Sequence, residues 1–217
     1  MSYQSQLQNL IEQKNTLGID VSTYQGNINY QDLIAKQPFV SFVCAKASEG
    51  FYVDPKFDMN FQNAFSAGLI VGAYHFFNEA IDPIKQAEVF YSKAKQSQFI
   101  ALDYELRKVN QSIADKSFLT FAEKVQQLFH MKPFIYTYPN FEHFPKEFAQ
   151  YRPWIACYSP SLTKPPVVAP WESTELWQFA GTDANIRLPN GAISDYDVFM
   201  GSQDEFAAYI DQQIIPS

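Results

Sequence analysis

The sequence is poor in the residues on which several kinds of function depend. Its 217 residues include three histidines and two cysteines, and 16 Lys and Arg are outnumbered by 23 Asp and Glu. A net charge of −7 argues against a nucleic-acid binder, which needs cations to neutralise phosphates, and against a strong electrostatic hold on an anionic surface. No run of about 18 apolar residues occurs, so we expect no membrane-spanning helix.

The few cysteines and histidines give little support to a disulfide or a metal site. Cys44 and Cys157 lie far apart, each in an apolar run, which favours two buried free thiols over a disulfide. No His-x-His or His-Glu-x-x-His spacing is present, so we expect no metal and no cofactor. His75 interrupts an apolar run and is expected to be a hydrogen-bonded core group or a support for the site.

Apolar and aromatic side chains are abundant instead. The hydrophobic fraction is 47% and charged residues make up 18%, which gives enough apolar surface for a folded core. Several short apolar runs are rich in β-branched and aromatic residues, as is typical of parallel strands covered on both faces. These runs are 17–22, 40–47, 69–77, 99–105 and 133–138.

Longer amphipathic segments separate these runs and predict helices. Asp54 and Asp82 each precede a proline, which favours a helix N-cap followed by proline at the first helical position. The first of these helices is expected to end at Gly68, and the longest helix is predicted over 112–130. Alternating strands and helices imply right-handed crossovers and an α/β fold.

The pattern changes in the last third of the chain. Further strands are predicted, but 159–170 is rich in proline and serine and has no helical period. The predicted elements are strands over 154–158, 176–180 and 193–199 and a terminal helix over 203–213. A regular (β/α)8 barrel takes about 250 residues. We therefore expect one domain over 1–217, an irregular TIM-like barrel of eight strands with shortened or missing late helices, preceded by a polar helical extension over 1–16.

Acidic side chains lie at the ends of several predicted strands, where a parallel barrel carries its chemistry. They are Asp20, Asp103, Glu105, Asp195 and Asp197. Residues two apart on a strand point to the same side, and ring closure makes the first and last strands neighbours. Carboxylates at close range cannot all ionise, and a protonated acid beside an ionised one is what glycosidic cleavage needs. A single acidic residue is more often a helix cap or a solvated surface residue. The presence of acids at the ends of several predicted strands nevertheless favours a functional site.

Other polar and aromatic residues near the strand ends are candidates for substrate binding. Lys46 and Glu49 form either a structural ion pair or substrate contacts. The aromatic side chains either stack on sugar rings or pack in the core. The full set of candidate substrate-binding residues is Lys46, Glu49, Tyr74, Tyr136, Trp154, Tyr158, Trp177, Gln178 and Asp197.

Seven motifs, in order along nearly the whole chain, resemble those of glycoside hydrolase family 25, the lysozymes (N-acetylmuramidases) of bacteria and their phages. They are Gly18-Ile19-Asp20-Val21-Ser22 with Gln25-Gly26, Ala45-Lys46-Ala47-Ser48-Glu49-Gly50, Gly72-Ala73-Tyr74-His75-Phe76, Leu102-Asp103-Tyr104-Glu105, Trp154-Ile155-Ala156, Trp177-Gln178-Phe179 and Asp195-Tyr196-Asp197-Val198-Phe199. The resemblance implies a barrel with an acidic groove that cleaves the β-1,4 bond between N-acetylmuramic acid and N-acetylglucosamine in peptidoglycan.

On the matching positions, the resemblance implies that Glu105 is the general acid and that Asp103 orients the substrate's N-acetyl group. Asp20 and Asp195 match the acids of the first and last strands. The family usually has asparagine at Asp197, so either Asp195 or Asp197 faces the cleft, and the match favours Asp195. We expect acidic neighbours to raise the pKa of Glu105. A carboxylate nucleophile or an inverting route is the alternative mechanism.

Two other functions are compatible with these residues: a non-catalytic barrel that binds cell-wall glycan, and a chitinase-like glycosidase. The first 15 residues lack a basic segment followed by an apolar one, so we expect no secretory signal. We expect the protein to be made in the cytoplasm and to reach the cell wall after release, as a phage endolysin does. If a leader was removed, the expected location is extracellular. Peptidoglycan strands are the expected partner of a monomer.

Overall fold

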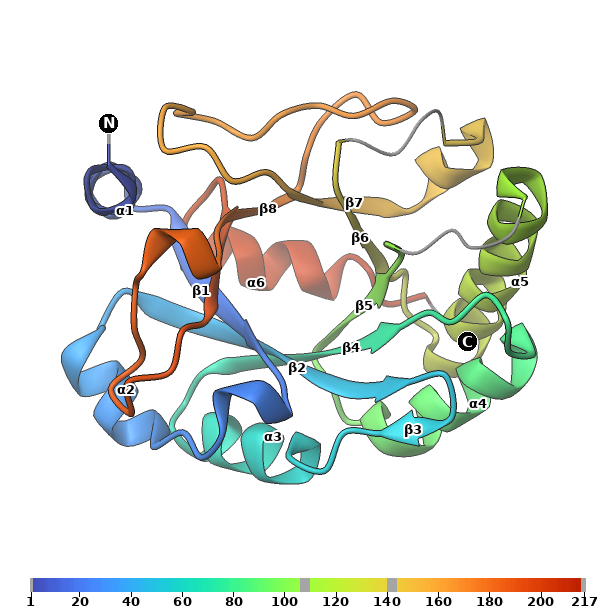
Figure 1. Cartoon of the computed structure of the whole chain (residues 1–217), viewed down its shortest axis with the longest axis horizontal. Helices are drawn as coiled ribbons and strands as arrows, with labels where there is room; N and C mark the ends of the chain where they lie inside the picture. Colours follow the sequence, from blue (N-terminus) through green and yellow to red (C-terminus); the bar gives the residue numbers. More distant parts are fainter. Residues whose placement is uncertain (1, 106–109, 140–143, 216–217) are drawn as a thin grey trace.

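The computed structural model describes residues 2–105, 110–139 and 144–215 and has a closed barrel at its centre (Figure 1). The strand order is β1-β9-β8-β7-β6-β5-β4-β2-β3, and β1 also pairs with β2, which closes a ring of eight strands with β3 at its edge. The strands are β1 (Thr16–Val21), β2 (Val40–Glu49), β3 (Tyr52–Val53), β4 (Ile70–Phe76), β5 (Phe99–Asp103), β6 (Phe134–Thr137), β7 (Arg152–Ala156), β8 (Leu176–Ala180) and β9 (Asp195–Phe199). The predicted eight-stranded α/β barrel is confirmed.

One strand of the ring runs against the others. β1, β2 and β4 to β8 pair with one another in parallel, whereas β9 is antiparallel to both β8 and β1. A parallel return needs a crossover that is usually a helix. The β8–β9 connection instead holds a 3-10 turn, η3 (Thr182–Ala184), and an antiparallel bridge between Arg187 and Ile193. The expectation of parallel strands is therefore wrong for β9.

Helices cover only part of the barrel. Figure 1 shows α2 to α5 along the lower and right-hand sides and long loops across the top. As predicted, the late helices are shortened or missing: a 3-10 turn follows β6, and 159–170 has no helix. The helices are α1 (Tyr3–Glu12), α2 (Tyr30–Lys36), α3 (Phe57–Ser66), α4 (Pro83–Ala94), α5 (Gln111–Phe129) and α6 (Gln203–Asp211), with the 3-10 turns η1 (Thr23–Gln25) and η2 (Lys146–Gln150).

The two predicted proline caps have different outcomes. Asp82 caps α4, and its carboxylate accepts hydrogen bonds from the Ile84 and Lys85 amides. Asp54 does not cap α3, which begins at Phe57. One Asp54 oxygen accepts from the Lys56 amide at 2.8 Å and the other from the Thr23 amide at 3.0 Å, so Asp54 ties two loops together.

Apolar side chains form one layer between the sheet and its helices and another inside the barrel. The inner layer comprises Phe42, Cys44, Phe99, Ala101, Phe134, Trp154, Leu176, Phe206 and Ile210. Phe206 of α6 packs on Phe42 and Phe99, whose ring centroids lie 4.9 and 5.7 Å away. Because both phenylalanines stand near the starts of their strands, α6 closes the amino end of the barrel. The opposite, carboxyl end remains open to a ligand.

The predicted core roles of His75 and the cysteines are largely confirmed. His75 accepts a hydrogen bond from Ser48 and donates one to Gln86, and burial lowers its pKa to about 3, so the ring is neutral. Cys44 and Cys157 are both free thiols, but Cys157 is half-buried rather than buried. Among the described residues, no helix combines the length and apolar character needed to cross a bilayer.

Candidate active site

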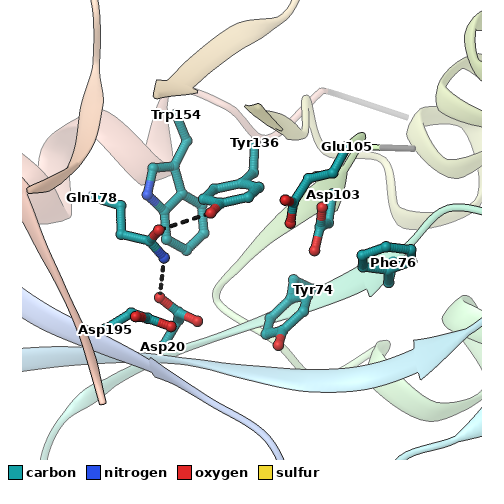
Figure 2. A pocket seen from close by; sticks show the side chains of 9 residues that line it. All are labelled: Asp20, Tyr74, Phe76, Asp103, Glu105, Tyr136, Trp154, Gln178 and Asp195. Carbon is teal, nitrogen blue, oxygen red and sulfur yellow. Dashed lines mark hydrogen bonds between the residues drawn. The ribbon is translucent and has the colours of Figure 1, made fainter. Parts of the chain in front are cut away.

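A pocket with a cavity volume of about 190 Å³ opens at the carboxyl end of the parallel strands (Figure 2). Every strand of the ring except β2 contributes to its wall, directly or through the residues that follow the strand. The pocket is lined by Asp20, Tyr74, Phe76, Asp103, Glu105, Tyr136, Trp154, Gln178 and Asp195. All of these except Phe76 were predicted from the sequence as site residues.

Asp195 reaches the pocket for a different reason from the one expected. It stands at the beginning of β9, not at a carboxyl end. Because β9 is antiparallel, its first residue lies at the mouth of the barrel, directly opposite Asp20 in the β1–β9 pairing. Asp197, two residues on, points to the same side but lies deeper and is 0% exposed. Asp195, rather than Asp197, therefore faces the pocket.

Asp103 and Glu105 point toward one another on the wall opposite Asp20 (Figure 2). The pKa of Asp103 is raised well above its usual range, first by burial and then by the charge of Glu105. Burial also raises the pKa of Glu105, while hydrogen bonding by the neighbouring Asp103 carboxyl and the charge of Lys46 lower it. The expected direction for Glu105 is thus found, but its cause is burial rather than acidic neighbours.

Asp20 stands at the end of a chain of hydrogen-bond donors. The hydroxyl of Tyr136 donates to Gln178 Oε1 at 2.7 Å, and the hydroxyl of Tyr158 donates to the same oxygen. Burial raises the pKa of both tyrosines, so both remain protonated donors. With its oxygen occupied in this way, the Gln178 amide turns its nitrogen to Asp20 Oδ2 and donates at 2.6 Å. The orientation of the Asp20 carboxylate is therefore fixed.

Two acids on the Asp20 side of the pocket have raised pKa values. The pKa of Asp20 is raised well above its usual range by burial and by the charge of Asp195, against the hydrogen bond from Gln178. The pKa of Asp195 is raised to about 6 by burial and then by the charge of Glu105. Because these carboxyl groups lie close together, the ionisation of one disfavours the ionisation of the others. They therefore titrate together and retain some protons near neutral pH.

Lys46 and Glu49 lie beside the pocket without lining it. Lys46 Nζ is 2.7 Å from Glu49 Oε2 and 5.0 Å from the centroid of the Phe76 ring. The structural ion pair is therefore formed, and the positive charge of Lys46 favours the ionised forms of Asp103 and Glu105. A direct substrate contact by either residue stays a prediction. Phe76 itself could have been inferred, because it stands two residues after Tyr74 on β4.

Two predicted aromatic contacts differ in their position. Tyr158 is exposed at the rim, where its hydroxyl bonds to Gln178. Trp177 is 0% exposed and packs in the outer layer of the core, with its Nε1 donating to the Cys157 carbonyl at 3.0 Å. Because Gln178 points into the barrel, its neighbour Trp177 points out of it. The structure therefore places Trp177 in the core, which is the alternative to sugar stacking. Its ring has no surface available to a sugar.

The described residues contain no group of three or more His, Cys, Asp or Glu side chains arranged to hold a metal ion. The chemistry available to the pocket is that of its carboxyl groups, hydroxyl groups and one amide. Together they can donate a proton, accept one and stabilise positive charge next to a bound polar ligand.

Comparison with known proteins points to a single family. The model of the family described as Glycosyl hydrolases family 25 matches residues 19–185. YegX of Escherichia coli K12, an uncharacterized protein, is 31% identical over 204 residues, which cover 89% of this chain and 73% of YegX. The crystal structure of the bacterial lysozyme from Streptomyces coelicolor is similar with a TM-score of 0.79 and 25% identity, covering 91% of this chain and 98% of that one.

A muramidase from Trichobolus zukalii has a similar structure, with a TM-score of 0.78, 27% identity, and coverage of 91% of this chain and 99% of its own. The family match spans β1 to the turn after β8 and includes the strands that carry Asp20, Asp103 and Gln178. On this evidence the chain belongs to Glycosyl hydrolases family 25.

Proposed function

We propose that the pocket is the active site of a lysozyme that cleaves the β-1,4 bond between N-acetylmuramic acid and N-acetylglucosamine in peptidoglycan. One observation carries the proposal: Asp20, Asp103, Glu105 and Asp195 surround one pocket at the open end of the barrel, and all have raised pKa values. Family membership and the similarity to proteins named lysozyme and muramidase support the same reaction.

Glu105 is the proposed general acid. Its side chain is less buried than that of Asp103, lines the pocket and points toward Asp103 (Figure 2). A raised pKa favours a protonated carboxyl group near neutral pH, which is the form that donates a proton to the leaving glycosidic oxygen. After the C–O bond breaks, the same carboxylate accepts a proton from the water that completes hydrolysis.

Asp103 is proposed to act on the substrate's N-acetyl group. Its Oδ1 atom is buried and has no hydrogen-bond partner within the described part of the chain, while the side chain lines the pocket. An amide N–H of the substrate can donate to this oxygen. Such a bond orients the N-acetyl oxygen for attack on the anomeric carbon, the substrate-assisted variant of glycoside hydrolysis. Attack by a carboxylate, or by water with inversion, is the alternative.

Asp20 and Asp195 face this pair across the pocket (Figure 2). Ionised carboxylates in this position stabilise the positive charge that develops at the anomeric carbon. Tyr136 and Trp154 form the wall between the two pairs, with ring centroids 5.3 Å apart in an edge-to-face arrangement. The half-buried Tyr136 ring offers a surface to the apolar face of a sugar, whereas Trp154 is 2% exposed and packs behind it.

The test is the release of reducing ends from purified peptidoglycan, with chitin assayed in parallel. We expect the wild-type chain to release reducing ends from peptidoglycan and much less from chitin, and Glu105→Gln to release none while keeping its circular dichroism spectrum and melting temperature. Near wild-type turnover by Glu105→Gln would remove Glu105 from its role. Binding of peptidoglycan without cleavage would instead support a non-catalytic barrel, and preferential cleavage of chitin a chitinase-like enzyme.

The proposed place of action is the bacterial cell wall, where the substrate is found. The proposal includes a single catalytic domain over 1–217 that acts as a monomer. Release of the protein from the cytoplasm, as for a phage endolysin, is the route proposed for its access to the wall. Size-exclusion chromatography with light scattering measures the oligomeric state directly.

A further inference from the structure

Beneath the pocket, inside the barrel, lies an acid that the proposed reaction does not use. Asp197 of β9 is 0% exposed, and its Oδ1 accepts a hydrogen bond from Trp154 Nε1 at 2.9 Å. Its other oxygen, Oδ2, is buried and has no donor among the described residues. The Asp20 carboxyl belongs to β1, the strand paired with β9, two register positions away on the same inward face, and its charge acts on Asp197.

Two neighbouring carboxyl groups can form a hydrogen bond only if one of them carries a proton. The titratable groups that face Asp197 are Asp20 of β1, Asp195 of β9, the Cys44 thiol of β2 and Tyr158 after β7. Each of these is neutral or negative, and no Lys, Arg or His of the described chain pairs with Asp197. Two neighbouring buried carboxylates without a cation are strongly unfavourable, so the Asp20–Asp197 pair holds a proton.

The surrounding donors indicate which carboxyl group is ionised. Tyr136 and Tyr158 donate to Gln178, and Gln178 donates to Asp20, so this series of hydrogen bonds ends on Asp20 as acceptor. Asp20 also reaches the pocket, whereas Asp197 is enclosed by the barrel. A charge is less unfavourable at the more accessible and better hydrogen-bonded position. The pKa values of Asp197 and Asp20 are both raised well above their usual range, chiefly by burial, so it is the hydrogen bonds and the accessibility that distinguish the two groups.

We propose that Asp197 is a protonated positioning residue, whose carboxyl O–H donates a hydrogen bond to Asp20 and holds that carboxylate ionised at the edge of the pocket. Trp154 fixes the orientation of Asp197 through its other oxygen. Asp20, which lines the pocket, then receives one donor from Gln178 and one from Asp197. The effect on catalysis rests on the proposed function of the pocket, whereas the protonation of Asp197 does not.

The test compares Asp197→Asn with Asp197→Leu. An asparagine keeps an oxygen for Trp154 and supplies an N–H donor to Asp20, so it replaces a protonated aspartate without loss of a bond. We expect its kcat to stay within about threefold of the wild type. Leucine is similar in size but supplies neither group, and removing a donor to a carboxylate is expected to lower kcat about 10- to 100-fold. An Asn variant as impaired as the Leu variant would overturn the proposal.

Infrared spectroscopy gives a readout that does not depend on activity. At neutral pH, the wild-type minus Asp197→Asn difference spectrum is expected to show the C=O stretch of one protonated carboxylic acid. The loss of a carboxylate band instead would show that Asp197 is ionised and would overturn the proposal. If wild type releases no muramic reducing ends, the proposed function fails, and this spectrum still decides the state of Asp197. Circular dichroism establishes that both variants are folded.

Discussion

Replacing Asp195 with asparagine is expected to stabilise the folded protein at neutral pH while it impairs the site. Asp195 is partly buried at the mouth of the barrel, opposite Asp20. Its pKa is raised from 3.8 to about 6, first by burial and then by the charge of Glu105. The structure therefore opposes the ionisation of this carboxyl group, and asparagine removes the charge at almost unchanged size.

The magnitude follows from the shift in pKa. One pKa unit corresponds to about 1.4 kcal/mol, so ionisation of Asp195 lowers the free energy of unfolding by about 3 kcal/mol. Because the folded-state pKa is the higher of the two, the folded chain binds this proton more tightly than the unfolded chain. The stability that this tightly bound proton contributes is fully present below pH 3.8 and is lost as the pH rises through about 6.

The measurement is urea unfolding of both proteins, followed by circular dichroism, at about pH 3.5 and about pH 7.5 on either side of this window. We expect Asp195→Asn to be more stable than the wild type by about 3 kcal/mol at the higher pH and nearly equal to it at the lower. Asp183→Asn, which neutralises an exposed acid of η3, is the matched control and should change stability at neither pH. A stability difference that does not depend on pH, or a less stable variant at the higher pH, would refute the reasoning.

Three further substitutions test the positions of groups around the site. A Cβ atom on Gly181 would lie 2.8 Å from an Asp195 oxygen and 3.1 Å from the Tyr158 ring. Gly181→Ala should therefore displace the Asp195 carboxylate and lower kcat about 10-fold in steady-state assays, with a small change in melting temperature. Tyr136→Phe removes a donor to the Gln178 amide and should lower kcat/KM by a similar factor; wild-type kinetics would contradict the proposed hydrogen-bond chain. Trp177→Phe should destabilise the fold by about 1–3 kcal/mol in urea unfolding and leave KM unchanged, because the side chain does not reach the pocket; a raised KM would place it at the substrate after all.

The carboxyl-end acids illustrate how much of the site could be predicted from the sequence. Asp20 and Asp103 follow apolar runs that read clearly as strands, and the carboxyl ends of parallel strands share one end of a barrel. Strand alternation was enough to place Asp103 and Glu105 on the same side. Alternation could also have separated Trp177 from Gln178 and added Phe76 to the pocket.

The direction of β9 could not be read from its residues. A strand's apolar pattern is the same in either direction, and only the connection before it, a bridge and a 3-10 turn instead of a helix, distinguishes the two. The choice between Asp195 and Asp197 depended on this direction. The cause of the raised pKa of Glu105 was equally inaccessible, because burial is a property of the assembled pocket.

Local hydrogen bonding limited the prediction of helix ends. Asp82 and Asp54 have the same Asp-Pro pattern, yet only Asp82 caps a helix. Asp54 bonds instead to the Thr23 amide, 31 residues earlier in the chain, and no local pattern reveals such a contact. The short helix α2 was also missed; its seven residues are too few to show a clear helical period.

The identity of the new reducing end tests the central claim most directly. Peptidoglycan digested by the chain is reduced with borohydride, hydrolysed and examined by mass spectrometry for the reduced sugar. We predict that wild-type digests contain reduced muramic acid, whereas digests with Glu105→Gln contain none above the undigested background. Reduced glucosamine in place of reduced muramic acid, or equal amounts of reduced muramic acid from both proteins, would contradict the account.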